Sequence, residues 1–98
     1  MNIVYKKIGD LRASEYNPRL MTKHDAETLM RSMKEYGFAE PIVINSYPSR
    51  EGVIVGGHQR VSIARILGIQ DIPCVEVNLD IEKEKRLNLF LNRALGSW

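Results

Sequence analysis

Cysteine is almost absent from this 98-residue chain, since Cys74 is the only one. A single thiol excludes an internal disulfide and a metal site built from several cysteines. Cys74 stands in an apolar stretch, residues 72–77, where a lone cysteine is usually a small buried side chain rather than a nucleophile. The two histidines, His24 and His58, do not have the spacing of zinc ligands. We therefore expect no metal site.

Long hydrophobic runs are absent as well. No segment approaches the roughly 20 apolar residues that a membrane helix requires, and Met1–Lys7 lacks the apolar core of a secretory signal. We therefore expect a cytoplasmic protein without a membrane partner. Charge of one sign is also scarce, because the formal net charge is only +2. So small a charge does not favour sequence-independent binding of DNA by this segment alone.

The composition that remains is that of a soluble globular protein, with 44% hydrophobic and 27% charged residues. The length fits a single domain over residues 1–98, which could be the N-terminal part of a longer protein. Strands are expected at residues 3–5, 42–44, 53–55 and 72–77. The turn-forming residues 47–52 join the second and third strands into a hairpin. Pro73 suits the start of its strand or an edge strand.

Three helices are expected between and after these strands. The first lies between Thr22, as its N-cap, and Gly37. The second follows Gly57 and ends at Gly68, and the third begins after Asp80. The third helix is expected to have one apolar face, formed by Leu87, Phe90, Leu91, Ala94 and Leu95. The fold class is therefore mixed α/β, while the order of the strands does not follow from these patterns.

The segment that indicates a function is Val53-Ile54-Val55-Gly56-Gly57-His58-Gln59-Arg60. Two glycines after a strand let the backbone approach a ligand closely, and the helix that follows offers free N–H groups and a positive dipole end to an anion. Arg60 could bind a phosphate with two hydrogen bonds, and His58 and Gln59 add further donors. The alternative is a plain turn between strand and helix, and the spacing alone does not decide between the two.

Several motifs in a fixed order resemble the ParB N-terminal domain, also called the ParB-like nuclease domain. They are Asn17-Pro18-Arg19, the segment from Ser32 to Ile44, the Val53–Arg60 loop, and the segment from Ala64 to Val75. The resemblance implies a ParB/sulfiredoxin-like fold, an α/β (α+β) domain with a small mixed sheet and flanking helices. It also implies nucleotide binding.

The same resemblance implies a ligand site. By this resemblance, the phosphate would be held by Gly57, Gln59 and Arg60, and the base would lie near Glu40, Pro41 and Ile42. The pocket would be closed by Asn17 and Arg19. Gly56 and His58, in the same loop, also belong to the expected ligand residues. A late phosphate-binding element of the family, Glu-Asn-x-Gln-Arg, appears here only as Leu91-Asn92-Arg93. Asn92 joins the expected ligand residues, and the alternative is that Asn92 and Arg93 belong to an exposed helix face.

Departures from the family pattern weaken or exclude several activities known in the family. His58 stands where partition proteins have glutamate, and Gln59 replaces the first of their two arginines, which weakens the case for cytidine triphosphate. Sulfiredoxins have their reactive cysteine at the position of His58, so repair of peroxiredoxin is excluded. Gly56 replaces an acidic residue of the related free-serine kinases, which leaves a kinase without its base. The resemblance is strongest to ParB-like domains of phage proteins and of proteins joined to DNA methyltransferases.

We therefore expect a nucleotide-binding domain of a DNA-transaction protein. Its ligand would be a nucleoside di- or triphosphate, ATP or CTP, with or without Mg²⁺. DNA would be engaged through a neighbouring domain or an oligomer such as a homodimer. One alternative is a nuclease or a nucleotide-dependent phosphotransferase, with Glu40 and His58 as candidate catalytic residues. A third reading is a ligand-free module that contacts DNA or protein.

Overall fold

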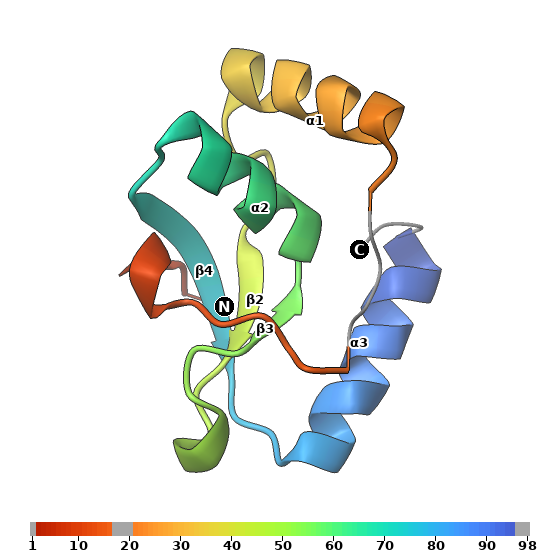
Figure 1. Cartoon of the computed structure of the whole chain (residues 1–98). Coiled ribbons are helices and arrows are strands. Elements are labelled where there is room, and N and C mark those ends of the chain that lie inside the picture. Colours follow the sequence, from red (N-terminus) through yellow and green to blue (C-terminus); the bar gives the residue numbers. More distant parts are fainter. Residues whose placement is uncertain (1, 17–20, 96–98) are drawn as a thin grey trace.

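The described residues form one four-stranded sheet and three α-helices, whose arrangement Figure 1 shows. The computed structural model describes residues 2–16 and 21–95, and the side chains of the last helix as far as Asn92. The elements, in chain order, are β1 (Val4–Lys7), the 3₁₀ helix η1 (Ile8–Asp10), α1 (Lys23–Tyr36), β2 (Ile42–Asn45), the 3₁₀ helix η2 (Pro48–Arg50), β3 (Ile54–Gly56), α2 (His58–Leu67), β4 (Asp71–Val77) and α3 (Ile81–Leu95). The mixed α/β prediction is confirmed, while the two 3₁₀ helices were not predicted.

The predicted helix caps are present. The hydroxyl of Thr22 accepts a hydrogen bond from the N–H of Asp25 (3.1 Å), and the carboxylate of Asp80 accepts one from the N–H of Lys83 (3.0 Å). Both bonds satisfy donors that a helix leaves free in its first turn. Gly68 ends α2 in the left-handed conformation, with a φ of 75°.

The strand order is β1-β4-β2-β3. β4 pairs antiparallel with β1 and parallel with β2, and β2 pairs antiparallel with β3 in the predicted hairpin. The expectation of an edge strand for Pro73 is wrong, because β4 is central. Pro73 is the third residue of β4 and precedes the first pair of the parallel ladder, Ile42 with Cys74. In the hairpin Val43 lies opposite Gly56, so the segment that enters β2 runs beside the end of β3.

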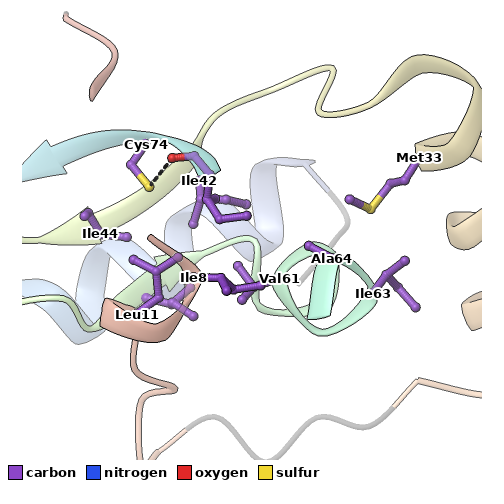
Figure 2. Close-up of a cluster of buried hydrophobic side chains, with 11 residues drawn as sticks. Ile8, Leu11, Met33, Ile42, Ile44, Val61, Ile63, Ala64 and Cys74 are labelled. Carbon is purple, nitrogen blue, oxygen red and sulfur yellow. Dashed lines mark hydrogen bonds between the residues drawn. The ribbon is translucent and has the colours of Figure 1, made fainter. Parts of the chain in front are cut away.

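The core lies between the sheet and the helical layer of α2 and α1. Figure 2 shows the buried side chains that converge there, from η1 and its C-cap, from β2 and β4, and from α1 and α2: Ile8, Leu11, Met33, Ile42, Ile44, Val61, Ile63, Ala64 and Cys74. Cys74 is fully buried and its thiol donates to the carbonyl of Ile72 (3.3 Å). Burial raises the pKa of Cys74 to about 11. The prediction of a small buried cysteine is confirmed.

Helix α3 packs beside β3. On the apolar face that was expected, Leu87 and Leu91 are half-buried and Phe90 is 65% exposed. The buried positions on α3 are the polar ones, Glu84 and Asn88, with Asn92 half-buried one turn further on. Their spacing of four residues places all three on one side of the helix. In the part of the chain that the structure describes, no helix is long and apolar enough to cross a membrane.

Candidate functional site

The two glycines of the predicted phosphate loop stand where the sheet gives way to a helix. β3 ends at Gly56 and α2 begins at His58, with Gly57 as the N-cap between them. Gly57 has a φ of 100°, and a Cβ atom there would lie 2.4 Å from Cδ1 of Ile42. Any larger residue would be strained in conformation and would clash. The glycine therefore allows the chain to turn at once and brings the start of α2 against β2.

The first turn of α2 presents backbone donors, and in the described part of the chain no N-cap side chain bonds to them. The first helical hydrogen bond runs from the N–H of Val61 to the carbonyl of Gly57 (3.1 Å). The N–H groups of residues 58–60 precede this bond, and the positive end of the helix dipole lies at the same place. This end of α2 favours an anion.

A small pocket of about 60 Å³ lies beside this turn. It is lined by residues from three segments, namely Glu40, Pro41, Val43, Gly56, Gly57, Arg60 and Leu91. The structure thus brings together five residues that were predicted for the ligand site, from both sides of the hairpin. Val43 and Leu91 were missed, because an apolar side chain carries no chemical signal in a sequence. The pocket is much smaller than the roughly 300–1,000 Å³ typical of pockets that hold a whole ligand, so its volume fits only part of a ligand of that size.

Arg60 lies across the pocket from one segment to the other. Its Nη1 donates to the backbone carbonyl of Glu40 (2.6 Å), and its guanidinium lies against Gly57. Burial lowers the pKa of Arg60, while the nearby carboxylate of Glu40 acts in the opposite direction. Among the described residues, no carboxylate forms an ion pair with Arg60 within 4.0 Å. A half-buried cation therefore stands at the positive end of a helix without a counter-ion from those residues.

His58, the first residue of α2, has its Nε2 directed toward the segment before residues 17–20, and it is not among the residues that line this pocket. Its Nε2 lies 3.3 Å from the backbone nitrogen of Ser14 and 3.1 Å from the hydroxyl of Ser14. Burial lowers the pKa of His58 to about 4, although the carboxylate of Glu84 opposes the shift. His58 is therefore neutral at pH 7. Its other ring nitrogen, Nδ1, is buried and has no hydrogen-bond partner among the described residues.

Two asparagines of α3 extend the site toward the helix. The amide of Asn88 donates to the carbonyl of Val55 (2.9 Å) and so fixes α3 to the strand that leads into the loop. One turn later, Oδ1 of Asn92 is buried without a hydrogen-bond partner in the described part of the structure. The alternative of an exposed helix face is wrong for Asn92. The side chain of Arg93 lies outside the described residues.

The remaining predicted site residues take different positions. The side chain of Ile42 is fully buried in the core, where it supports Gly57, so a ligand could reach only its backbone. Gln59 is partly buried on the first turn of α2, and the carboxylate of Glu40 is exposed at the rim of the pocket. Asn17 and Arg19 lie outside the described residues, so their role in closing the pocket stays a prediction.

A buried polar network beside the site was not predicted at all. The fully buried carboxylate of Glu84 accepts hydrogen bonds from Nε and Nη2 of Arg50 (3.0 and 2.7 Å), from the amide of Asn45 (2.7 Å) and from the hydroxyl of Tyr16 (2.5 Å). Burial by itself raises the pKa of Glu84, but these donors outweigh it and hold the pKa below its ordinary value. The spacing of four between Glu84, Asn88 and Asn92 is the sequence signal that could have revealed this polar face.

A separate and larger cavity, of about 480 Å³, contains none of the predicted residues. It lies between η1 and the end of the hairpin turn, and its charged side chains have mixed sign. Lys6 pairs with Glu76 (3.5 Å), and the guanidinium of Arg12 donates to the backbone carbonyl of Glu51 (2.9 Å). Because these basic side chains already have partners, the larger cavity is less suited to bind an anion than the small pocket is.

Known proteins resemble this chain over most of its length. A protein of Escherichia coli K12, the ParB-like nuclease domain-containing protein YnaK, is 26% identical over 86 residues, which is 88% of this chain and 94% of that protein. The chromosome-partitioning protein ParB of Caulobacter crescentus, in complex with CTP-γ-S, superposes with a TM-score of 0.79 at 24% identity. That match covers 100% of this chain and 55% of the ParB chain, so this chain spans about half of it.

Two further structures share the fold. Sulfiredoxin from Arabidopsis thaliana has a TM-score of 0.73 at 20% identity, with 89% of this chain and 97% of that chain covered. A free serine kinase in complex with AMP has a TM-score of 0.62 at 21% identity, with 76% and 30% covered. At these identities the two structures establish the fold, and the predicted ParB/sulfiredoxin-like architecture is confirmed. Residues 2–93 match the family described as the ParB N-terminal domain, and the chain therefore belongs to that family.

Proposed function

We propose that this domain binds the phosphate end of a nucleotide at the Gly56–Arg60 loop and acts as the ligand-responsive module of a DNA-transaction protein, such as a partition, phage or methylase-linked factor. The observation that carries the proposal is the position of Arg60. A cation at the positive end of a helix is unfavourable by itself. A phosphate between Arg60 and the free N–H groups of α2 would make the same arrangement favourable, because both would then bind an anion.

Unpaired polar atoms support the same site. Nδ1 of His58 and Oδ1 of Asn92 are buried without partners among the described residues, and both residues belong to the predicted ligand set. An unpaired buried polar atom costs about 1–3 kcal/mol. A polar ligand that reaches them would recover part of that cost.

The known ligands of similar folds agree with a nucleotide. The similar ParB of Caulobacter crescentus is in complex with CTP-γ-S, and the similar free serine kinase is in complex with AMP. For this chain we propose a nucleoside di- or triphosphate, ATP or CTP. The described residues contain no group of three metal-ligating side chains. If Mg²⁺ takes part, it would therefore be held mainly by the phosphates and by water, as is common for this ion.

DNA, in this proposal, is contacted through a neighbouring domain or a second copy of the chain. The formal net charge of +2 is too small to supply the many phosphate contacts on which DNA affinity depends. The nucleotide would act through contacts with the loop and with Asn92 on α3, and so change how that neighbour engages.

The enzymatic alternatives have a narrower basis. A nuclease or a phosphotransferase needs a carboxylate or another base at the reacting atoms. Glu40 is the one carboxylate that lines the pocket among the described residues, and His58 has a depressed pKa but is directed toward Ser14. An assay for released phosphate and for cleaved DNA, with Glu40→Gln as the control, separates turnover from binding.

The proposal is tested by calorimetric titration of the purified protein with ATP, ADP, CTP, GTP and AMP, each with and without Mg²⁺. Arg60→Ala should weaken binding of the preferred nucleotide about 10- to 100-fold, as expected for the loss of charged hydrogen bonds worth about 1.5–3 kcal/mol. Arg31→Ala is the matched control, because Arg31 is exposed on α1, away from the pocket. No binding to the unaltered protein at millimolar concentration of any of the five would refute the proposed function.

A further inference from the structure

Three consecutive residues before the undescribed segment 17–20 are each held by their side chains. Ser14 contacts the ring of His58, Glu15 pairs with Arg50 (2.8 Å), and the hydroxyl of Tyr16 donates to Glu84 (2.5 Å). Residues 13–16 belong to no helix or strand. These contacts therefore hold the strap formed by residues 14–16 in place, with one end on the first turn of α2 and the other on α3.

The contact between Ser14 and His58 determines where the imidazole carries its proton. A backbone N–H can only donate, and the N–H of Ser14 is directed at Nε2 of His58. This N–H finds an acceptor only where Nε2 is unprotonated, and the hydroxyl of Ser14, 3.1 Å from Nε2, can then donate to the same nitrogen. In the neutral ring the proton therefore resides on Nδ1, since the hydrogen bond made by one nitrogen sets the protonation of the other. The depressed pKa of His58, about 4, agrees with a ring that stays neutral.

The proton on Nδ1 has no partner in the described part of the structure. Nδ1 is buried and forms no hydrogen bond to the described residues. His58 immediately follows Gly57, which lines the small pocket, and it opens the same helix turn as Arg60. A neutral donor at this place needs an acceptor, and phosphate oxygens are strong acceptors.

We propose that Ser14 is a positioning residue for the ligand site. Its backbone N–H fixes His58 in the tautomer that carries the proton on Nδ1, so that His58 offers one neutral donor to an acceptor oxygen of an anionic ligand. The inference rests on the proposed function for the identity of that ligand, but the tautomer is a property of the ligand-free protein. It also gives His58 a role other than that of a base, because Nε2 is occupied by the strap.

The tautomer is measured first, by long-range ¹⁵N–¹H correlation spectra of histidine-labelled protein at pH 7 without ligand. We expect a protonated Nδ1 and an unprotonated Nε2 for His58, while exposed His24 serves as the internal reference. Ser14→Pro removes the N–H, and in a variant that keeps the dispersed spectrum of a folded protein the preference for Nδ1–H should be lost. A proton on Nε2 in the unaltered protein would overturn the inference, whether or not any nucleotide binds.

The ligand contact is then tested with a matched pair of variants and with CTP-γ-S and AMP as the probes. In His58→Asn the amide nitrogen can take the place of Nδ1, whereas in His58→Gln it can take the place of Nε2. Both variants should bind more weakly than the unaltered protein, but the asparagine variant about tenfold more tightly than the glutamine variant, the difference of one hydrogen bond. Equal affinities, or the reverse order, would overturn the inference. Failure of both probes to bind the unaltered protein counts against the proposed function and leaves the spectroscopic result to decide the role of Ser14.

Discussion

Replacing Glu84 by glutamine should destabilise the domain by about 2–4 kcal/mol, although the two side chains have almost the same shape. Each carboxylate oxygen of Glu84 has two donors. Oε1 accepts from Asn45 and from Nε of Arg50, and Oε2 accepts from Tyr16 and from Nη2 of Arg50. Glutamine has one acceptor oxygen, so one pair of donors must face an NH₂ group.

The size of this destabilisation depends on which pair of donors loses its acceptor. The hydroxyl of Tyr16 can turn round and accept from the new NH₂ group, because a hydroxyl is both donor and acceptor. Nη2 of Arg50 can only donate, so its charged hydrogen bond is lost, at about 1.5–3 kcal/mol. The side chain of Arg50 is only 13% exposed, so water replaces this partner poorly and the remaining attraction to the carboxylate charge is also lost. The total is about 2–4 kcal/mol, a large part of the roughly 5–15 kcal/mol available to such a domain.

Urea unfolding followed by far-ultraviolet circular dichroism measures this change in the free energy of unfolding. Thermal unfolding should show a midpoint lower by roughly 10–25 °C. Glu82→Gln is the matched control, since Glu82 is exposed on the same helix, and it should cost less than about 1 kcal/mol. A double-mutant cycle with Arg50→Met should give a coupling energy of about 1–3 kcal/mol. A change within about 0.5 kcal/mol for Glu84→Gln, or no coupling to Arg50, would refute the reasoning.

Two further predictions concern the loop. The pKa of His58 is about 4 in the folded protein, against an ordinary value of 6.5. Between these two pH values the unfolded chain takes up a proton that the folded chain does not. The free energy of unfolding should therefore fall as the pH is lowered from 6.5 to 4. The full shift in pKa corresponds to about 3 kcal/mol, which partial exposure of the ring reduces to about 1–2 kcal/mol. Denaturant titrations from pH 7 to 5 should show this fall in the free energy of unfolding for the unaltered protein but not for His58→Gln. The same dependence on pH in both proteins would disprove the prediction. Gly57→Ala should cost about 2–4 kcal/mol, because φ is 100° and the new methyl group would lie 2.4 Å from Ile42. Gly9→Ala, where nothing lies within 4 Å, should change the free energy of unfolding by less than about 0.5 kcal/mol, and equal effects in the two variants would contradict the steric account.

Local features of this fold could be predicted because they are encoded within a few neighbouring residues. Thr22 and Asp80 cap their helices by bonds to N–H groups three residues on. The loop at Gly56–Gly57 was recognised because glycines after a strand and before a helix have few other uses. Helical spacing identified an apolar face on α3, but it could not tell which face packs, and Phe90 is exposed.

The sequence by itself thus determined the strands, the α-helices, their caps and the position of the Gly56–Gly57 turn, and its ordered motifs indicated the family. Tertiary structure alone decided the strand order β1-β4-β2-β3 and the hairpin register, with Val43 opposite Gly56, that sets Glu40 and Pro41 beside the loop. It also decided the partners of His58 and Glu84, which are contacted by Ser14 and Tyr16 across 44 and 68 residues of sequence. The physical reason is that a hydrogen bond between distant residues depends on how the whole chain packs, and no short pattern records which residue the packing brings near.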